Sequence, residues 1–374
     1  MRKLIAVLMA SATFAACSGS SSSSSSNPIP IDQIPTELAK SFCAAEQACN
    51  PFFYSVAFTN SDCVATFAKQ FQEASYNQIQ AAVTAGTVKY DGNLARTCAD
   101  AIGAGGCKVL DNNAPDSCQQ ALSGSAEAGA DCDIDEECKD LSHCDVSGST
   151  CPGTCAPRVS AGVACDKDGD CALGYVCSAV TSRCVAPAAE GEPCGGTVAE
   201  NCSAGLLCIG DDTAKKQAGT CKTAAATLTG HEGDACDLQL GPWCADGLSC
   251  VVQSITAGAL NSKCQAIAAV GASCGLGIPS NCPKGQYCPL QVVDLLTGTF
   301  TATCTALPAA GDACAPKVAL IRCAGDLVCD ETTAPAKPVC TAPHDLGQTC
   351  SDNTLCYSQH CVGGACVPAS PCAK

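Results

Sequence analysis

The stretch GVACDKDGDCALGYVC, residues 162–177, has three cysteines and little apolar bulk. With Cys184 it forms a unit of four cysteines, and the chain repeats this unit. Between the second and third cysteines lie five residues in the first six units and four in the last, whereas the segment between the third and fourth cysteines varies in length. A spacing that recurs along a chain indicates repeated small structures. We therefore predict seven repeats over residues 129–374, whose first cysteines are Cys132, Cys165, Cys194, Cys236, Cys274, Cys314 and Cys350.

In all seven units a glycine stands three residues before the first cysteine, and these glycines are Gly129, Gly162, Gly191, Gly233, Gly271, Gly311 and Gly347. A glycine at one fixed place in every unit indicates a backbone position that needs positive φ or a close approach. The single large apolar side chain near the third cysteine, such as Tyr175 or Leu206, is too little to fold a unit. Disulfides must replace the core, and each contributes about 2–5 kcal/mol.

We expect each unit to form short β-hairpins, with the first cysteine bonded to the third and the second to the fourth. In the second unit this expectation assigns Cys165, Cys171, Cys177 and Cys184 to disulfides. Cysteine makes up 37 of the 374 residues, a level typical of a disulfide scaffold in an oxidising compartment. The sequence has no Cys-x-x-Cys pair, which is the usual sign of a cytosolic zinc site.

The N-terminus has the pattern of an export signal. Arg2 and Lys3 precede an apolar stretch over residues 4–16, which is too short to span a bilayer. Two alanines then precede Cys17 and a serine run. This boundary resembles the lipobox of bacterial lipoproteins, which implies that Cys17 becomes a lipidated N-terminus, although Phe14 stands where that family has Leu, Val or Ile. The alternative is a secretory signal of the eukaryotic type.

This resemblance implies a signal peptide over residues 1–16 and a lipidated, serine-rich tether over residues 17–30. Ser18 stands in place of the aspartate that in enteric bacteria resembles an inner-membrane retention signal. We therefore expect attachment to the outer membrane or cell surface of a Gram-negative bacterium, with secretion as the alternative. Because 37 is odd, at least one cysteine cannot be in an internal disulfide, and Cys17 is the one we expect.

Residues 31–128 are expected to form a small helical domain with an apolar core, since six of the eight phenylalanines fall between Phe42 and Phe71. Apolar spacing predicts one helix after Pro35 and a second that is capped by Asn60 or Ser61 and ends at Gly86. A turn is predicted at residues 91–92, a short third helix over residues 94–102 that ends at Gly103, and a fourth over residues 116–122. Three disulfides in one of fifteen possible pairings would join Cys43, Cys49, Cys63, Cys98, Cys107 and Cys118.

Two known families share features of this chain. GVACDKDGDCALGYVC and GEPCGGTVAENCSAGLLC, residues 162–177 and 191–208, resemble the Dickkopf N-terminal cysteine-rich repeat in their spacing. The helical segment with GTVKYDGNLARTC, residues 86–98, is similar to the one before cysteine-rich repeats in surface lipoproteins of myxobacteria. The ten-cysteine order of the vertebrate Dickkopf family is absent, so no receptor-binding residue carries over and Wnt antagonism is not implied.

The acidic run DKDGD places Asp166, Asp168 and Asp170 at the first, third and fifth positions of a calcium loop. An EF-hand also needs glycine at the sixth position and glutamate at the twelfth, where this chain has Cys171 and Cys177. The run is therefore not an EF-hand, and its three carboxylates stay weak calcium candidates. Residues 131–137 hold a similar acidic cluster with the same interpretation. We expect no other cofactor or metal.

No sequence motif points to catalysis. GASCG, residues 271–275, matches the nucleophile pattern Gly-x-Ser-x-Gly, but Gly271 and Cys274 already belong to the repeat frame, so the match is accidental. The four histidines lie in different segments, at His143, His231, His344 and His360. The formal net charge of −16 without basic runs argues against nucleic acid as a partner. We expect that the protein is not an enzyme.

These features favour an exported protein that is attached to the membrane through lipid on Cys17. We expect it to act as a structural or ligand-binding surface module for an extracellular or periplasmic protein or glycan. The alternative is a disulfide-rich inhibitor of secreted proteases. Six cysteines in the helical domain and 28 in the repeats leave Cys151 and Cys372 unassigned. Three options remain for these two cysteines: they bridge each other if the array, meaning the row of seven units, folds back; they pair with neighbouring cysteines; or they link two molecules. A straight array forbids the first option, because a disulfide requires Cα atoms within about 7 Å.

Overall fold

The computed structural model describes residues 27–49, 54, 58, 61–110, 116–140, 142–146, 151–166, 168–178, 180–195, 202–212, 215–237, 243–245, 247–256, 259–278, 281–289, 292–294, 299–300, 302–314, 323–331, 337–370 and 372. The expected signal peptide, Cys17 and most of the tether lie outside these residues. Within them, no helix has both the length and the apolar character needed to cross a membrane.

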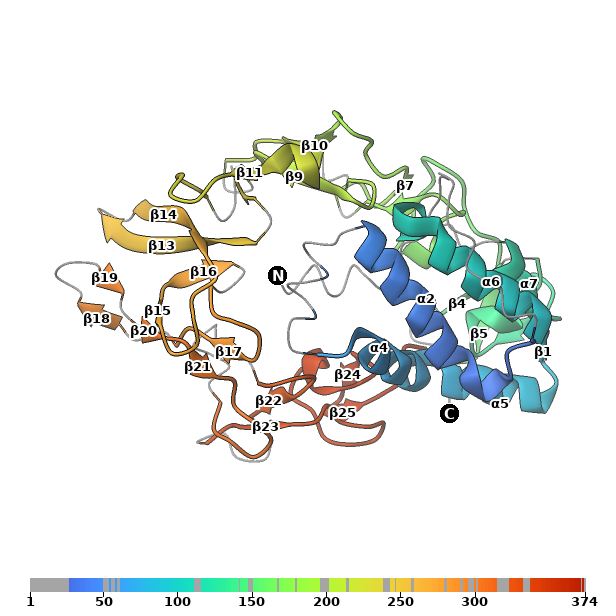
Figure 1. The fold of residues 1–374 in the computed structure, drawn as a ribbon. Helices are drawn as coiled ribbons and strands as arrows, with labels where there is room; N and C mark the ends of the chain where they lie inside the picture. Colours follow the sequence, from blue (N-terminus) through green and yellow to red (C-terminus); the bar gives the residue numbers. More distant parts are fainter. Residues whose placement is uncertain are drawn as a thin grey trace.

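Helices form the N-terminal region, as predicted (Figure 1). After the short turn η1 (Ile31–Gln33), helix α2 (Ile34–Cys49) has Pro35 in its first turn, where its missing N–H costs nothing. Helix α4 (Cys63–Phe71) begins one residue later than expected, because the Asp62 carboxylate accepts the bond from the Ala65 N–H at 3.0 Å. It continues through the π-helical turn η2 (Gln72–Tyr76) into α5 (Asn77–Ala85), which ends at Gly86 with φ of 82°, as predicted.

The predicted turn at residues 91–92 was wrong, because Asp91 caps a helix. Its carboxylate accepts bonds from the N–H groups of Asn93 and Leu94, and α6 (Gly92–Gly105) follows. The helix passes through Gly103, which was expected to end it. A glycine inside a helix costs about 1 kcal/mol, and here its bare Cα faces Ser41 of α2, with which α6 packs. The turn η3 (Gly106–Leu110) and α7 (Asp116–Ala121) complete the region.

Among the described residues, the fully buried core of this region is mainly aliphatic, which corrects the expected phenylalanine core. Phe42, Phe67 and Phe71 are only partly buried and pack edge to face or stacked against one another. The first four-cysteine unit also contributes to the core, since Ile134 is only 6% exposed within it. The buried cluster comprises Ile29, Ile34, Tyr76, Ile79, Ala82, Val88, Ala95, Ala99, Ala121 and Ile134.

All six cysteines of the helical region are in disulfides, in one of the fifteen pairings that the sequence left open. Two of these bonds tie α2 to its neighbours, one to α4 and one to η3, and the third joins α6 to α7. The bonds are Cys43–Cys63, Cys49–Cys107 and Cys98–Cys118.

In the seven units the first cysteine is bonded to the third and the second to the fourth, which confirms the expected order of pairing. The first-to-third bonds are Cys132–Cys144, Cys165–Cys177, Cys194–Cys208, Cys236–Cys250, Cys274–Cys288, Cys314–Cys329 and Cys350–Cys361. The second-to-fourth bonds are Cys138–Cys155, Cys171–Cys184, Cys202–Cys221, Cys244–Cys264, Cys282–Cys304, Cys323–Cys340 and Cys356–Cys366. The buried clusters of the units consist mainly of these half-cystines.

The strands are short and form small, mostly antiparallel sheets. In the helical region and the first three units they are β1 (Val88–Tyr90), β2 (Leu122–Gly124), β3 (Asp131–Cys132), β4 (His143–Asp145), β5 (Gly153–Ala156), β6 (Val176–Cys177), β7 (Cys184–Val185), β8 (Pro193–Cys194), β9 (Leu206–Ile209) and β10 (Gly219–Thr223). Short helical turns here are η4 (Asp135–Glu137), η5 (Asp168–Asp170) and α8 (Ala224–Thr227).

In the last four units the strands are β11 (Leu228–Gly230), β12 (Trp243–Cys244), β13 (Leu248–Thr256), β14 (Ala259–Ala266), β15 (Ser273–Cys274), β16 (Leu276–Ile278), β17 (Gln286–Tyr287), β18 (Val292–Asp294), β19 (Thr299–Phe300), β20 (Ala302–Thr303), β21 (Thr305–Ala306), β22 (Val328–Asp330), β23 (Val339–Thr341), β24 (Cys361–Val362) and β25 (Ala365–Cys366), with the turn η6 (Asn353–Leu355). The longest hairpin, β13–β14, belongs to the fourth unit. Strands β16 and β19 of the fifth unit pair with β13, so the two units share one five-stranded sheet.

One hydrogen-bond frame recurs in every unit and explains the repeated glycine. The seven glycines all have positive φ, between 70° and 91°. In the second unit the Gly162 N–H donates to the Cys184 carbonyl at 2.8 Å, and the Cys184 N–H donates back to the Val163 carbonyl at 2.9 Å. The bond from the fourth cysteine to the residue after the glycine recurs in all seven units. The positive φ turns the chain so that both bonds form.

The residue three positions before the glycine also forms backbone hydrogen bonds that recur between units. Val159 pairs in parallel with the segment at Cys171: its N–H donates to Asp170 and its carbonyl accepts from Ala172, both at 2.8 Å. Ala126 and Ala188 make the same parallel bridge in their units. Nine residues lie between the fourth cysteine of one unit and the first cysteine of the next, except for fourteen after Cys221. Most of the nine residues are therefore part of the unit that follows, and the connection outside both units is about three residues long.

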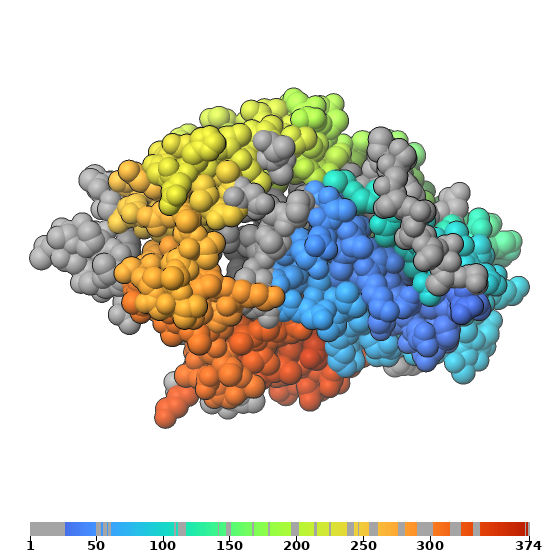
Figure 2. All heavy atoms as spheres, viewed as in Figure 1, coloured from blue at the N-terminus to red at the C-terminus, as the bar shows by residue number. Residues whose placement is uncertain are grey.

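The array is not a straight rod: it curves back onto the helical region (Figure 1). The chain passes from α7 through β7, β9 and β10 to β13–β16, then returns along β22–β25 to lie against α4 (Figure 1). In the space-filling view the last unit, in red, adjoins the blue helices (Figure 2). A disulfide joins Cys151 of the first unit to Cys372, at a Cα–Cα distance of 5.1 Å. Of the three options for these two cysteines, the structure has the bridge between them.

Candidate binding site

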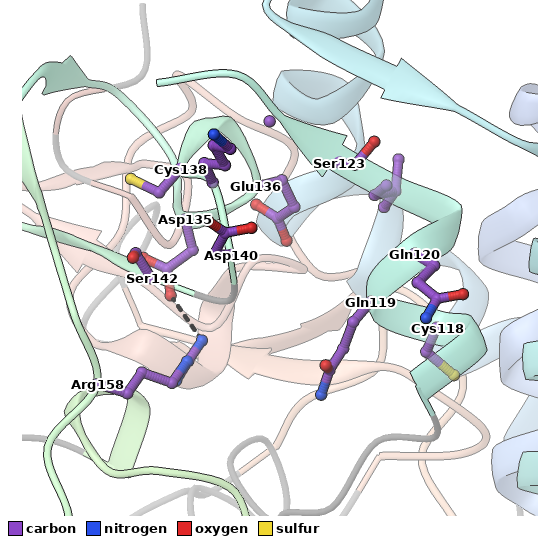
Figure 3. A pocket seen from close by; sticks show the side chains of 13 residues that line it. Cys118, Gln119, Gln120, Ser123, Asp135, Glu136, Cys138, Asp140, Ser142 and Arg158 are labelled. Atoms are coloured by element: carbon purple, nitrogen blue, oxygen red, sulfur yellow. Dashed lines mark ion pairs between the residues drawn. The ribbon is translucent and has the colours of Figure 1, made fainter. Parts of the chain in front are cut away.

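A cavity of about 500 Å³ lies where the helical region meets the first unit (Figure 3). One side is formed by α7 and β2, with Gln119, Gln120 and Ser123. The other side is formed by η4 and the turn after it, with Asp135, Glu136, Cys138, Lys139, Asp140 and Ser142 (Figure 3). Arg158 reaches in from the connection to the second unit.

Close backbone contact holds these two sides together. Strand β2 pairs with β1 and ends at Gly124. A Cβ at Gly124 would lie only 2.0 Å from the carbonyl group of Glu137, so only glycine fits this contact without a shift. The Thr87 hydroxyl also donates to the Glu137 carboxylate at 2.7 Å, and Ile134 is buried in the helical core. The helical region and the first unit therefore fold as one body.

The charged groups around the cavity are partly engaged in ion pairs. The Asp135 carboxylate accepts a bond from the Cys144 N–H at 2.9 Å and lies 3.6 Å from the Arg158 guanidinium. The Lys139 ammonium is paired with Glu127 at 2.7 Å, and this pair raises the Lys139 pKa. Burial, followed by the nearby negative charge of Asp135, raises the pKa of the Glu136 carboxyl to about 7. Near neutral pH the protonated form of Glu136 is therefore well populated, and in that form the carboxyl group donates as well as accepts hydrogen bonds.

The lining supports binding of a polar ligand. It offers amide, hydroxyl and carboxyl groups and one guanidinium, and no histidine is among its described residues. Its two cysteines, Cys118 and Cys138, are in disulfides and carry no nucleophilic thiol. The sequence had marked Asp135 and Glu136 within an acidic cluster, but it gave no signal for Gln119, Gln120 or Arg158, which meet them only through docking.

The three calcium candidates are placed in the frame of the second unit. The Asp168 carboxylate accepts from the Cys177 N–H at 2.6 Å, and Asp170 accepts from the Asp166 N–H at 2.9 Å. The first unit has the same two bonds at the equivalent positions, from Cys144 to Asp135 and from Asp133 to Glu137. The acidic residues of both units thus share a structural role that the calcium-loop pattern did not reveal.

Groups of three cysteine sulfurs lie within 4.8 Å of one another in the units, for example Cys132, Cys138 and Cys155. Metal binding to cysteine requires thiolates. These sulfurs are in the bonds Cys132–Cys144 and Cys138–Cys155, so the grouping reflects two stacked disulfides. The ten cysteines that the sequence singled out as disulfide-forming, six in the helical region and four in the second unit, are all in such bonds.

Two histidines lie at joints between units. His143 of the first unit has Nε2 at 3.6 Å from Asp170 of the second. His344, which enters the seventh unit, has Nε2 at 3.7 Å from the buried Asp330 of the sixth. The structure does not bring the four histidines of the sequence together in one site.

Cys17, the predicted lipidation site, lies outside the described residues. No protein-family model matches the chain, and neither the curated proteins nor the solved structures include a significant match.

Proposed function

We propose that this is an exported protein, anchored by lipid on Cys17, that acts by contact as a ligand-binding or structural surface module without catalysis. The observation that carries the proposal is the use of its cysteines. The eighteen disulfides take up 36 of the 37 cysteines, and the one left over is Cys17. Disulfides in such number persist only in an oxidising compartment. The odd cysteine stands where the sequence resembles a lipobox.

The proposed location is the outer membrane or cell surface of a Gram-negative bacterium, with secretion as the alternative. The serine-rich tether gives the anchored protein a root-mean-square reach of about 20 Å. The resemblance of residues 86–98 to the helical segment of myxobacterial surface lipoproteins favours the same location. We also propose that the seven units are repeats similar to the Dickkopf N-terminal type, which their cysteine spacing supports.

The proposed ligand is an extracellular or periplasmic protein or a glycan. Two features of the described residues suit such ligands. The cavity beside Glu136 and Arg158 carries amide, hydroxyl and charged groups in its lining, and the sheet shared by the fourth and fifth units is broad compared with the two- and three-stranded sheets of the other units. Repeated units with different loops also favour contact at several points, which raises avidity.

Lipidation is tested by labelling cells with palmitate. We expect label and membrane fractionation in the wild-type protein and loss of both in Cys17→Ser. The matched control is Ser18→Ala, which changes the next residue of the tether and leaves the cysteine in place. Label that survives Cys17→Ser would contradict the proposal.

Contact function is tested with the oxidised chain lacking residues 1–17, which is soluble if the anchor is the lipid. We expect it to bind whole cells or isolated envelopes of the producing organism, with binding lost after full reduction. A panel of secreted proteases tests the alternative function. Inhibition of one protease at a one-to-one ratio, without binding to cells, would replace the surface module by an inhibitor.

A further inference from the structure

One disulfide differs from the other seventeen in two respects. It joins residues 221 apart, whereas the bonds within units join residues 10 to 22 apart and those of the helical region join residues 20 to 58 apart. It is also the one with an exposed cysteine. Among the cysteines of the described residues, Cys151 is exposed, and all others are buried or half-buried.

This bond is also the strongest link between the two ends of the curved array. The hydrogen bonds and the ion pair described across the closure are exposed or half-buried. Lys69 forms an ion pair with Asp345 and has its Nζ 5.1 Å from the centre of the Tyr357 ring. Hydrogen bonds run from Thr66 to Asp326, Leu346 to Glu73, Ala369 to Ala74 and Ser370 to Asp133.

Among the described residues, the buried apolar cluster of the helical region does not extend across the closure. The buried cluster of the helical region includes Ile134 of the first unit but no residue of the seventh. Surface ion pairs and single hydrogen bonds contribute little once water competes for them. The closed form of the array therefore depends strongly on Cys151–Cys372. The fold of a single unit depends on it far less, since each unit has two disulfides of its own.

We propose that Cys151–Cys372 is a thiol–disulfide exchange site, at which a dithiol partner opens the closed array while the units stay folded. A thiolate of the dithiol attacks Sγ of Cys151, the exposed residue of the pair, and the bond to Cys372 breaks. Cys372 leaves as a thiolate and takes up a proton. The second thiol of the partner then attacks the mixed disulfide and releases Cys151, so the partner is oxidised to a disulfide and the protein gains two thiols. The same reaction in reverse closes the array.

The test uses the full oxidised chain in detergent with dithiothreitol as the dithiol probe. After a brief exposure the free thiols are alkylated and mapped. We expect Cys151 and Cys372 to be alkylated about tenfold faster than any other pair, because access limits exchange. The matched control is Cys49–Cys107, which also joins distant segments but has both cysteines half-buried. Reduction of Cys49–Cys107 or of any unit disulfide at an equal rate would overturn the proposal.

Opening is measured by small-angle X-ray scattering on the selectively reduced chain and on the double variant Cys151→Ser/Cys372→Ser. We expect the same larger radius of gyration in both, with the far-ultraviolet circular dichroism of the oxidised protein retained. A radius unchanged in the double variant would show that the polar contacts alone hold the array closed, which would also overturn the proposal. Neither experiment depends on the lipid, so failure here leaves the Cys17 proposal untouched.

Discussion

In the helical region the buried residues are mainly isoleucine, valine and alanine, whereas in the array they are mainly half-cystines. The helical region is stabilised by a hydrophobic core, since its apolar side chains are removed from water on folding. Each unit of the array is too small to exclude water in that way and is held by two crossed bonds over 10 to 22 residues. The comparison indicates that one chain combines a helical region whose folded state depends partly on disulfides with units whose folded state depends on them entirely.

Full reduction should separate the two regions most strongly. Each disulfide that closes a loop of about 15 residues contributes about 3 kcal/mol, so a unit loses both of its main supports at once. A fully buried aliphatic side chain in the helical region still contributes about 1.5–3 kcal/mol without any disulfide. We expect reduced, alkylated protein to keep part of its helical circular dichroism while residues 129–374 become readily cleaved by protease.

The control for this experiment is the oxidised protein under the same protease treatment, with the fragments identified by mass spectrometry. Cleavage confined to the helical region, or reduced units as resistant as oxidised ones, would contradict the contrast between the two kinds of interior.

Two glycine substitutions compare the contact between the helical region and the first unit with the glycine turn inside a unit. At Gly124 a new Cβ would meet the Glu137 backbone at 2.0 Å, so Gly124→Ala should cost about 3 kcal/mol and loosen the docking of the first unit. At Gly162 nothing lies within 4 Å, and only the φ of 79° opposes a side chain. Gly162→Ala should therefore cost about 1 kcal/mol. Denaturant unfolding of the oxidised variants gives both values, and equal costs would show that the joint is no tighter than the frame.

A further effect is expected from the carboxyl group at the joint. The folded pKa of Glu136 is about 7, above the ordinary value of 4.5, so folding takes up a proton between these two pH values. Stability should therefore fall as the pH rises from about 4.5 to about 7, by about 3 kcal/mol. Glu136→Gln removes the ionisable group and should make the variant more stable than wild type at pH 8 but not at pH 4.5. A parallel pH dependence in both proteins, measured by thermal unfolding, would assign the effect elsewhere.

The sequence predicted the parts of the fold that depend on short distances along the chain. The disulfide order within a unit joins residues no more than 22 apart, and the repeated glycine reflects a turn within the same unit. The helix end at Gly86 is equally local. Where several residues suit one role, the choice was missed: Asp62 caps α4 although Asn60 and Ser61 also suit a cap.

The features that the sequence did not predict depend on how distant segments dock. The pairing of Cys151 with Cys372 follows from the summed turns at the joints between units, and no single spacing encodes that sum. The cavity joins α7 to η4 and Arg158, which come from three different segments. The aliphatic core has the same origin, because Ile134 of the first unit completes it. The acidic residues of the sequence pointed to a role for Asp135 and Glu136, but they did not predict the cavity surface that these two share with Gln119.

The short connections between units have a consequence for how this protein can change. In an open solenoid a unit can be gained or lost, because each unit contacts only its neighbours. Here the strand that leads into each unit is part of that unit, so every joint adds a fixed turn. Cys151 and Cys372 meet only if these turns sum to a closed circuit, since a disulfide requires Cα atoms within about 7 Å. Duplication or deletion of one unit would displace Cys372 by the length of that unit. Closure therefore fixes the number of units, while the tips of their loops stay free to vary.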